Sequence, residues 1–119
     1  MSFITNIILL FPDIEDELER MKEVNSFTYR GILLNLISIN EPNPEEFVTW
    51  YGGRKKLSGN MFIGAYNYFD EEGFRQHLFS NVNWESPEYV QLIIKSEAEW
   101  TYKVYTDAGK TLVYDSILQ

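Results

Sequence analysis

The sequence has no cysteine and only one histidine among its 119 residues. Without cysteine there can be no disulfide, no thiolate nucleophile and no cysteine-bound zinc site. A single histidine also argues against a transition-metal centre. The phosphate- and dinucleotide-binding patterns GxxxxGK[ST] and GxGxxG are missing, as is the GxSxG setting of a nucleophilic serine. We therefore expect no metal and no cofactor, and the residue inventory argues against an enzyme.

Long apolar runs are missing as well. A membrane-spanning helix needs about 20 consecutive apolar residues, and no run approaches that length. The apolar segment 3–11 is interrupted by Asn6, and no basic residue precedes Arg20. A secretory signal would need a positive n-region and a small-residue cleavage site. We expect a soluble, cytoplasmic protein with no membrane partner.

Basic residues are scarce: ten Lys and Arg face eighteen Asp and Glu, which leaves a net charge of -8. That balance opposes nucleic acid as a partner, because its phosphates must be neutralised by Lys and Arg. It permits a basic protein, because complementary fields speed encounter. Half of the acids have a simpler explanation, since they would open predicted helices and complement the positive end of the helix dipole. These are Asp13, Glu15, Asp16, Glu17, Glu45, Glu46, Asp70, Glu71 and Glu72.

The residue pattern predicts alternating strands and helices along the chain. Segments 3–11, 31–39, 61–68, 89–95 and 100–104 read as strands, and a turn at 107–110 leads to a short sixth strand through Leu112 and Tyr114. One helix is expected from an Asp13 cap, with Ile14, Leu18 and Met21 at helical spacing. A second should begin at Asp70 with Phe74 and Leu78 inward, and a short third should follow Asn43 and Pro44.

This order predicts an α+β fold with a mainly antiparallel sheet of four to six strands and two main helices on one face. It matches the split β-α-β plan of ferredoxin-like domains, with a C-terminal hairpin that extends the sheet. No linker divides the chain, so residues 1–119 are expected to form a single domain. Ile8, Leu34, Ile63 and Ile93 should be core residues of four strands.

A basic loop is the first candidate site. Arg54, Lys55 and Lys56 stand together in an acidic chain and follow two aromatics and two glycines. The segment is Trp50, Tyr51, Gly52, Gly53, Arg54, Lys55 and Lys56. Successive backbone N–H groups near the glycines with adjacent cations can hold a phosphate or carboxylate. They can equally grip an acidic protein, with the aromatics as anchors. A solvated connection is the plainer interpretation.

An aromatic strand face is the second candidate. In 61–68, alternation puts Phe62, Gly64, Tyr66 and Tyr68 on one side. Aromatics on an open sheet resemble the base-stacking surface of RNA-recognition domains, but both the local sequence and the net charge oppose that function. Core packing or a dimer interface at Phe62, Tyr66 and Tyr68 is the better interpretation.

His77 and the carboxylate runs fit structural roles. His77 lies one position from the Phe74/Leu78 stripe, and no nucleophile with an orienting carboxylate accompanies it. The acid pairs lie at solvated helix starts rather than in a cleft.

The leading hypothesis is a small acidic binding module that works through protein–protein contacts. An immunity-type or antitoxin-type inhibitor of a basic enzyme is one form, and a bacterial or phage accessory protein is another. The alternative is a protein or enzyme that binds a small anionic ligand at 52–56. A third possibility is self-association as a homodimer.

Overall fold

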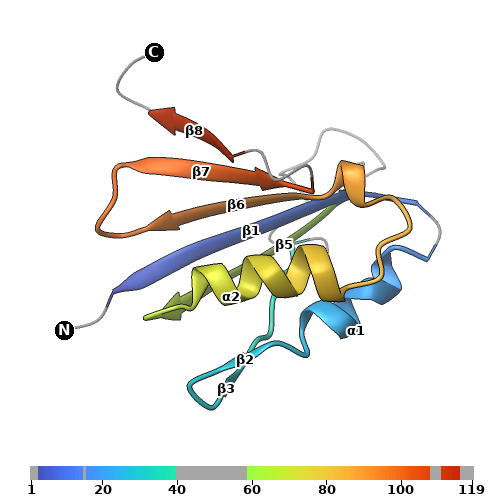
Figure 1. The fold of residues 1–119 in the computed structure, drawn as a ribbon, viewed down its shortest axis with the longest axis horizontal. Coiled ribbons are helices and arrows are strands. Elements are labelled where there is room, and N and C mark those ends of the chain that lie inside the picture. Colours follow the sequence, from blue (N-terminus) through green and yellow to red (C-terminus); the bar gives the residue numbers. More distant parts are fainter. Residues whose placement is uncertain (1–2, 15, 40–58, 108–110, 116–119) are drawn as a thin grey trace, which may run out of the picture.

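The computed structural model describes residues 3–14, 16–39 and 59–107, and the backbone of 111–115 (Figure 1). Its strands are β1 (Ile4–Pro12), β2 (Thr28–Tyr29), β3 (Ile32–Leu33), β4 (Ile37–Ser38), β5 (Gly59–Asn67), β6 (Gln91–Ser96), β7 (Thr101–Thr106) and β8 (Thr111–Asp115). Its helices are η1 (Leu18–Arg20), α1 (Met21–Val24), α2 (Glu71–Gln76), η3 (His77–Asn81) and η4 (Pro87–Tyr89).

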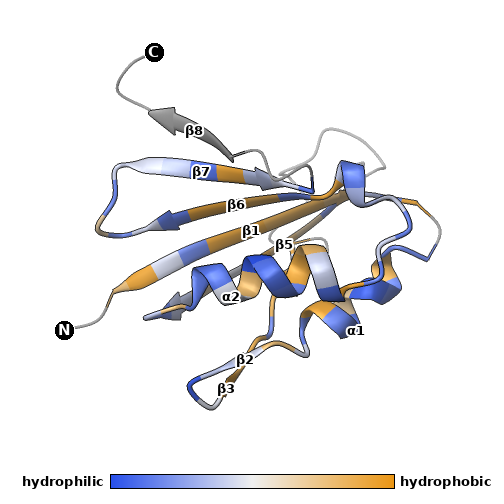
Figure 2. Cartoon of the chain, viewed as in Figure 1, coloured by the Kyte–Doolittle hydropathy of each residue, from blue (hydrophilic) through white to orange (hydrophobic). Residues whose placement is uncertain are grey.

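The described strands form a six-stranded sheet in the order β4-β5-β1-β6-β7-β8, and β2 and β3 pair as a separate hairpin. Every described strand pair is antiparallel. The prediction of an α+β protein with a mainly antiparallel sheet is confirmed. β1 takes an interior position because alternate residues on both of its sides are apolar, as in a strand covered on two faces. Figure 2 shows the hydrophobic colour running along most of β1 and β6.

The core is built from one set of alternate strand residues and from the helices. On β1 the buried residues are Ile7, Leu9 and Phe11. Other members of the same core cluster are Leu92 and Ile94 on β6, Met21 and Val24 on α1, and Phe74 and Leu78 on the α2–η3 segment. Helix α1 contacts η3 beside the sheet (Figure 1). We call the side of the strands that bears Ile7 and Leu9 the core face, and the side that bears Ile8 and Leu10 the second face.

The structure corrects the predicted core. Ile8, Ile63 and Ile93 lie on the second face and are half-buried or exposed, so the expectation that they are core residues is wrong. Leu34 is buried as expected, but it lies between β3 and β4 rather than in a strand. Strand side chains alternate with a period of two, and these strands are apolar in both phases. Hydropathy alone therefore could not show which phase faces the helices.

The first helix begins later than predicted. Residues 16 and 17 form a turn before η1, and the backbone of Asp16 has a φ of 73°, which a right-handed helix does not allow. Ile14 and Leu18, two members of the predicted apolar stripe, are exposed, whereas Met21 is buried. The expected Asp13 cap is thus not formed.

The second helix begins as predicted. The Asp70 side chain accepts a hydrogen bond from the Gly73 N–H at 3.1 Å, which is an N-terminal cap. Phe74 and Leu78 point into the core. Gly73 suits this cap, because a Cβ there would collide with the Asp70 carboxylate. Helical structure then continues from α2 into the π-helix η3.

The predicted strand 31–39 is broken into β3 and β4. Between them the Asn25 side chain replaces a strand neighbour: its Oδ1 accepts from the Leu36 N–H at 3.0 Å and its Nδ2 donates to the Leu36 carbonyl at 3.4 Å. The Leu36 side chain then packs directly over Gly64 of β5. Glycine at this position leaves room for the Leu36 side chain. Within the described residues, no helix is long and apolar enough to cross a membrane.

Candidate functional site

The basic loop lies outside the described residues. Trp50, Tyr51, Gly52, Gly53, Arg54, Lys55 and Lys56 all fall within 40–58, so a site there for an anionic ligand remains a prediction.

The three aromatic interface candidates are separated by the fold. Phe62 is a buried core residue stacked on Phe11, with ring centroids 5.8 Å apart. Tyr66 packs against the core, and its hydroxyl accepts a hydrogen bond from the Asn35 N–H at 2.7 Å. Tyr68 follows the end of β5 and is 45% exposed. Of the three, Tyr68 has the greatest access to a partner, and no common aromatic face is formed.

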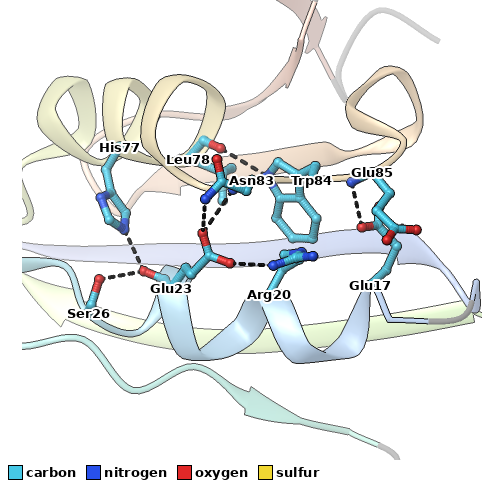
Figure 3. Close-up of polar contacts among 9 residues, drawn as sticks. All are labelled: Glu17, Arg20, Glu23, Ser26, His77, Leu78, Asn83, Trp84 and Glu85. Atoms are coloured by element: carbon cyan, nitrogen blue, oxygen red, sulfur yellow. Dashed lines mark hydrogen bonds and ion pairs between the residues drawn. The ribbon is translucent and has the colours of Figure 1, made fainter.

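His77 belongs to a polar cluster that joins α1 to the segment after η3 (Figure 3). The His77 Nε2 atom lies 2.7 Å from the Glu23 carbonyl oxygen, which also accepts from the Ser26 hydroxyl at 2.6 Å. The Glu23 carboxylate pairs with Arg20 at 2.8 Å and accepts from the Asn83 N–H at 3.0 Å. The Arg20 hydrogen bond is the main cause that lowers the pKa of Glu23 below its ordinary value, followed by the Asn83 N–H. The His77 and Asn83 contacts join α1 to η3 and to the segment that follows it, which is a structural role.

Glu17 completes this cluster as a fully buried carboxylate. Its Oε1 accepts from the Glu85 N–H at 2.8 Å and its Oε2 accepts from the Ser86 N–H at 3.2 Å. A buried carboxylate without hydrogen-bond donors can serve catalysis, but each Glu17 oxygen already accepts a hydrogen bond from a backbone N–H. The sequence suggested a solvated helix start here, and only the tertiary contact reveals the structural role.

A cleft of about 250 Å³ lies between α2 and β7. Its main feature is the Arg75 guanidinium, 4.4 Å from the centre of the Tyr105 ring. The Tyr105 hydroxyl donates to Glu71 at 3.2 Å, and burial, followed by the nearby Glu71 charge, raises the pKa of that hydroxyl. The lining includes two acidic residues, Glu72 and Asp107, and one basic residue, Arg75, so it favours neither an anionic nor a cationic ligand. In the described ranges no three potential metal ligands cluster.

The second face of the sheet carries a row of aliphatic side chains in register across five strands. Strand pairing places Ile37 opposite Ile63, Ile63 opposite Ile8, Ile8 opposite Ile93, and Ile93 opposite Val104. These five residues form a row across the sheet, which we call the aliphatic row. Ile37 is 57% exposed and Ile63 is 37% exposed, while the other three are half-buried. None of the five belongs to the core cluster formed by the described residues.

Acidic residues are missing from both faces of β1, β4, β5, β6 and β7. The second-face positions of β1, β4, β5, β6 and β7 carry no carboxylate, although the chain has eighteen. Lys95 supplies the positive charge, and its ammonium lies 5.9 Å from the centre of the Tyr102 ring, which shares the face. Interfaces are depleted of charge at their centre and enriched in aromatics. The second face shares the depletion of charge, with Lys95 as the one charged residue and Tyr102 as the one aromatic at its positions in β1, β4, β5, β6 and β7.

The apolar surface extends past the row towards the end of β1. Leu10 and Met61 are paired on the neighbouring row of the second face. They help to line a hollow of about 270 Å³, walled by the exposed Tyr89. A second shallow hollow continues from Tyr89 to Ile14. These hollows adjoin the aliphatic row, and Glu88 and Gln91 add polar groups to their lining.

The sequence-based prediction missed this surface because it assigned Ile8, Ile63 and Ile93 to the core. One usable signal was present for two of them: Ile8 and Ile63 are in the phase opposite to the aromatics of their predicted strands. Comparison with protein-family models, with curated proteins and with solved structures found no significant match.

Proposed function

We propose that this protein is a binding module that docks another protein chain on the second face of its sheet. The aliphatic row is the observation that carries the proposal. Five branched aliphatic side chains in register leave water in contact with apolar surface that a partner could cover, and covering apolar area is the main favourable term in association. Contiguous exposed apolar patches on soluble proteins mark interaction sites.

The charge distribution supports the same function. The net charge of -8 is carried by residues outside the strand positions of the second face. The second face itself bears one charged residue among the described strand positions, Lys95, so apolar contact would hold a partner there. Long-range attraction would add to this contact for a basic partner. An immunity-type or antitoxin-type inhibitor of a basic enzyme is one form of such a module, and a bacterial or phage accessory protein is another.

We also propose that the sheet follows the split β-α-β plan, with both α-helices on the core face. The strand order β6-β1-β5-β4, with α1 between β1 and β4 and α2 between β5 and β6, supports this plan. In that plan the second face is the side left for a partner.

Two charge substitutions test the proposal. Ile63→Lys puts a cation in the aliphatic row, whereas Leu33→Lys puts one at a more exposed apolar residue of the β2–β3 hairpin, away from the row. Each variant and the wild type would be used as bait in an extract of the source cells. We expect the wild type and Leu33→Lys to retain the same protein and Ile63→Lys to lose it, with affinity reduced about 30-fold or more as for a hot-spot residue. Retention by Ile63→Lys would overturn the proposal.

A further inference from the structure

We propose that the partner on the second face is a second copy of this chain, so that two sheets stack face to face in a two-fold symmetric dimer. This inference rests on the proposed function, since it names the occupant of the same surface. Sheets that stack in this way pack about 10 Å apart with their strands roughly aligned.

The position of the aliphatic row favours a copy of itself. A two-fold dimer uses the same patch on both subunits, so the patch must be complementary to itself. The row crosses β4, β5, β1, β6 and β7 at one level. A two-fold axis that runs between the sheets, parallel to the strands, lays one row against the other and sets Ile37 of one copy over the Val104 end of its partner. Aliphatic side chains then meet aliphatic side chains along the whole row.

The available area is sufficient for a dimer. Neighbouring strands lie about 4.8 Å apart and each strand residue extends about 3.3 Å, so one residue covers roughly 16 Å² of a sheet face. Strands β1 and β5 have nine residues, β6 and β7 six, β8 five and β4 two, which gives about 500–600 Å² per copy. A dimer would then bury about 1,000–1,200 Å² in total, which reaches the threshold of about 1,000 Å² for a specific interface.

Charge sets a distinctive salt dependence. Each copy carries a net charge of -8, so two copies repel one another at long range, and the carboxylate-free strand positions of the second face keep that repulsion out of the contact. Salt screens the repulsion, so the dimer should tighten as ionic strength rises. A complex with a basic partner would weaken under the same change.

The test is sedimentation equilibrium of the full chain at low and high salt. We expect a species of twice 14.0 kDa whose dissociation constant falls with added salt. Ile63→Lys should raise that constant about 30-fold or more, and Leu33→Lys should leave it unchanged. Ile37→Lys, on the two-residue strand β4, provides a second disruption at a more exposed residue should Ile63→Lys fail to fold, as judged by circular dichroism.

A 14.0 kDa monomer at about 100 µM in both salts would overturn the dimer, as would a dimer that survives both Ile63→Lys and Ile37→Lys. The two proposals fail separately. A monomeric wild type that still captures another protein through Ile63 overturns the second copy as occupant and leaves the docking surface standing. If neither Ile63→Lys nor Ile37→Lys weakens the dimer, and neither reduces the capture of protein from the extract, then the docking surface and the dimer are both overturned.

Discussion

The buried Glu17 carboxylate accepts a hydrogen bond from the Glu85 backbone N–H at 2.8 Å, across 68 residues of sequence. With the second bond to the Ser86 N–H, it fixes the segment between η3 and η4 against the turn that precedes η1. One buried side chain thus accepts from two backbone N–H groups that are distant in the sequence.

Removing that acceptor should destabilise the protein. Glu17→Ala leaves the Glu85 and Ser86 N–H groups without their partner at a partly buried site, and we expect a loss of about 1–3 kcal/mol in the free energy of unfolding. Glu17→Gln keeps an acceptor oxygen and should lose less. Glu19→Ala, at an exposed position two residues on, should stay within about 0.5 kcal/mol. Urea unfolding of the three variants measures this, and equal losses at residues 17 and 19 would contradict it.

The Glu23 cluster should contribute a small acid-sensitive term to stability. In the folded protein the pKa of the Glu23 carboxyl is lowered from its ordinary value of 4.5, mainly by the hydrogen bond from Arg20. A depressed carboxyl pKa stabilises the folded state above the unfolded value, and this contribution is lost as the pH falls through the folded pKa. Because the side chain is 30% exposed, solvent screening keeps the effect modest. Wild type and Glu23→Gln should therefore differ in unfolding free energy at pH 7 and converge below pH 4.5. A constant difference across that range would refute the assignment.

Gly64 should tolerate no side chain. An added Cβ would lie 2.6 Å from Leu36 Cδ2 and 2.9 Å from Tyr66 Cε2, so Gly64→Ala should cost about 1–3 kcal/mol through overpacking. Gly59→Ala is the matched control on the same strand, because its Cβ would meet the Phe11 carbonyl oxygen at 3.4 Å. Combining Gly64→Ala with Leu36→Ala should recover part of the loss relative to the sum of the single changes. Thermal or urea unfolding of these variants measures the effect, and strict additivity would show that the two residues do not press on each other.

Adjacent residues on β1 distinguish the two faces of the sheet. Leu9 is fully buried on the core face and Ile8 is half-buried on the second face. Leu9→Ala should cost about 2–5 kcal/mol regardless of protein concentration. Ile8→Ala should cost less in a dilute sample and more as concentration rises, because dimerisation links stability to association. The melting temperature of both variants over a hundredfold concentration range provides the measurement, and a concentration-independent Ile8→Ala would count against the dimer.

The sequence by itself determined the elements that depend on local chemistry. The Asp70 cap, the strand that contains Met61 to Asn67 and the final hairpin strand follow from side-chain alternation and turn residues, which act within a few positions of one another. The α+β class followed from their order.

Tertiary contacts decided the rest. Glu17 is held by Glu85 and Ser86 within a segment that looked like an amphipathic helix start, and Asn25 takes the place of a strand neighbour for Leu36. Tertiary contacts also decided which side of β1 faces the core. Ile7 and Ile8 are the same residue type in successive positions, and only packing in one cluster with Phe74 and Leu78 selects Ile7 for the core. A period-two pattern that is apolar in both phases has two solutions of similar local energy, and the helices that cover one side decide between them.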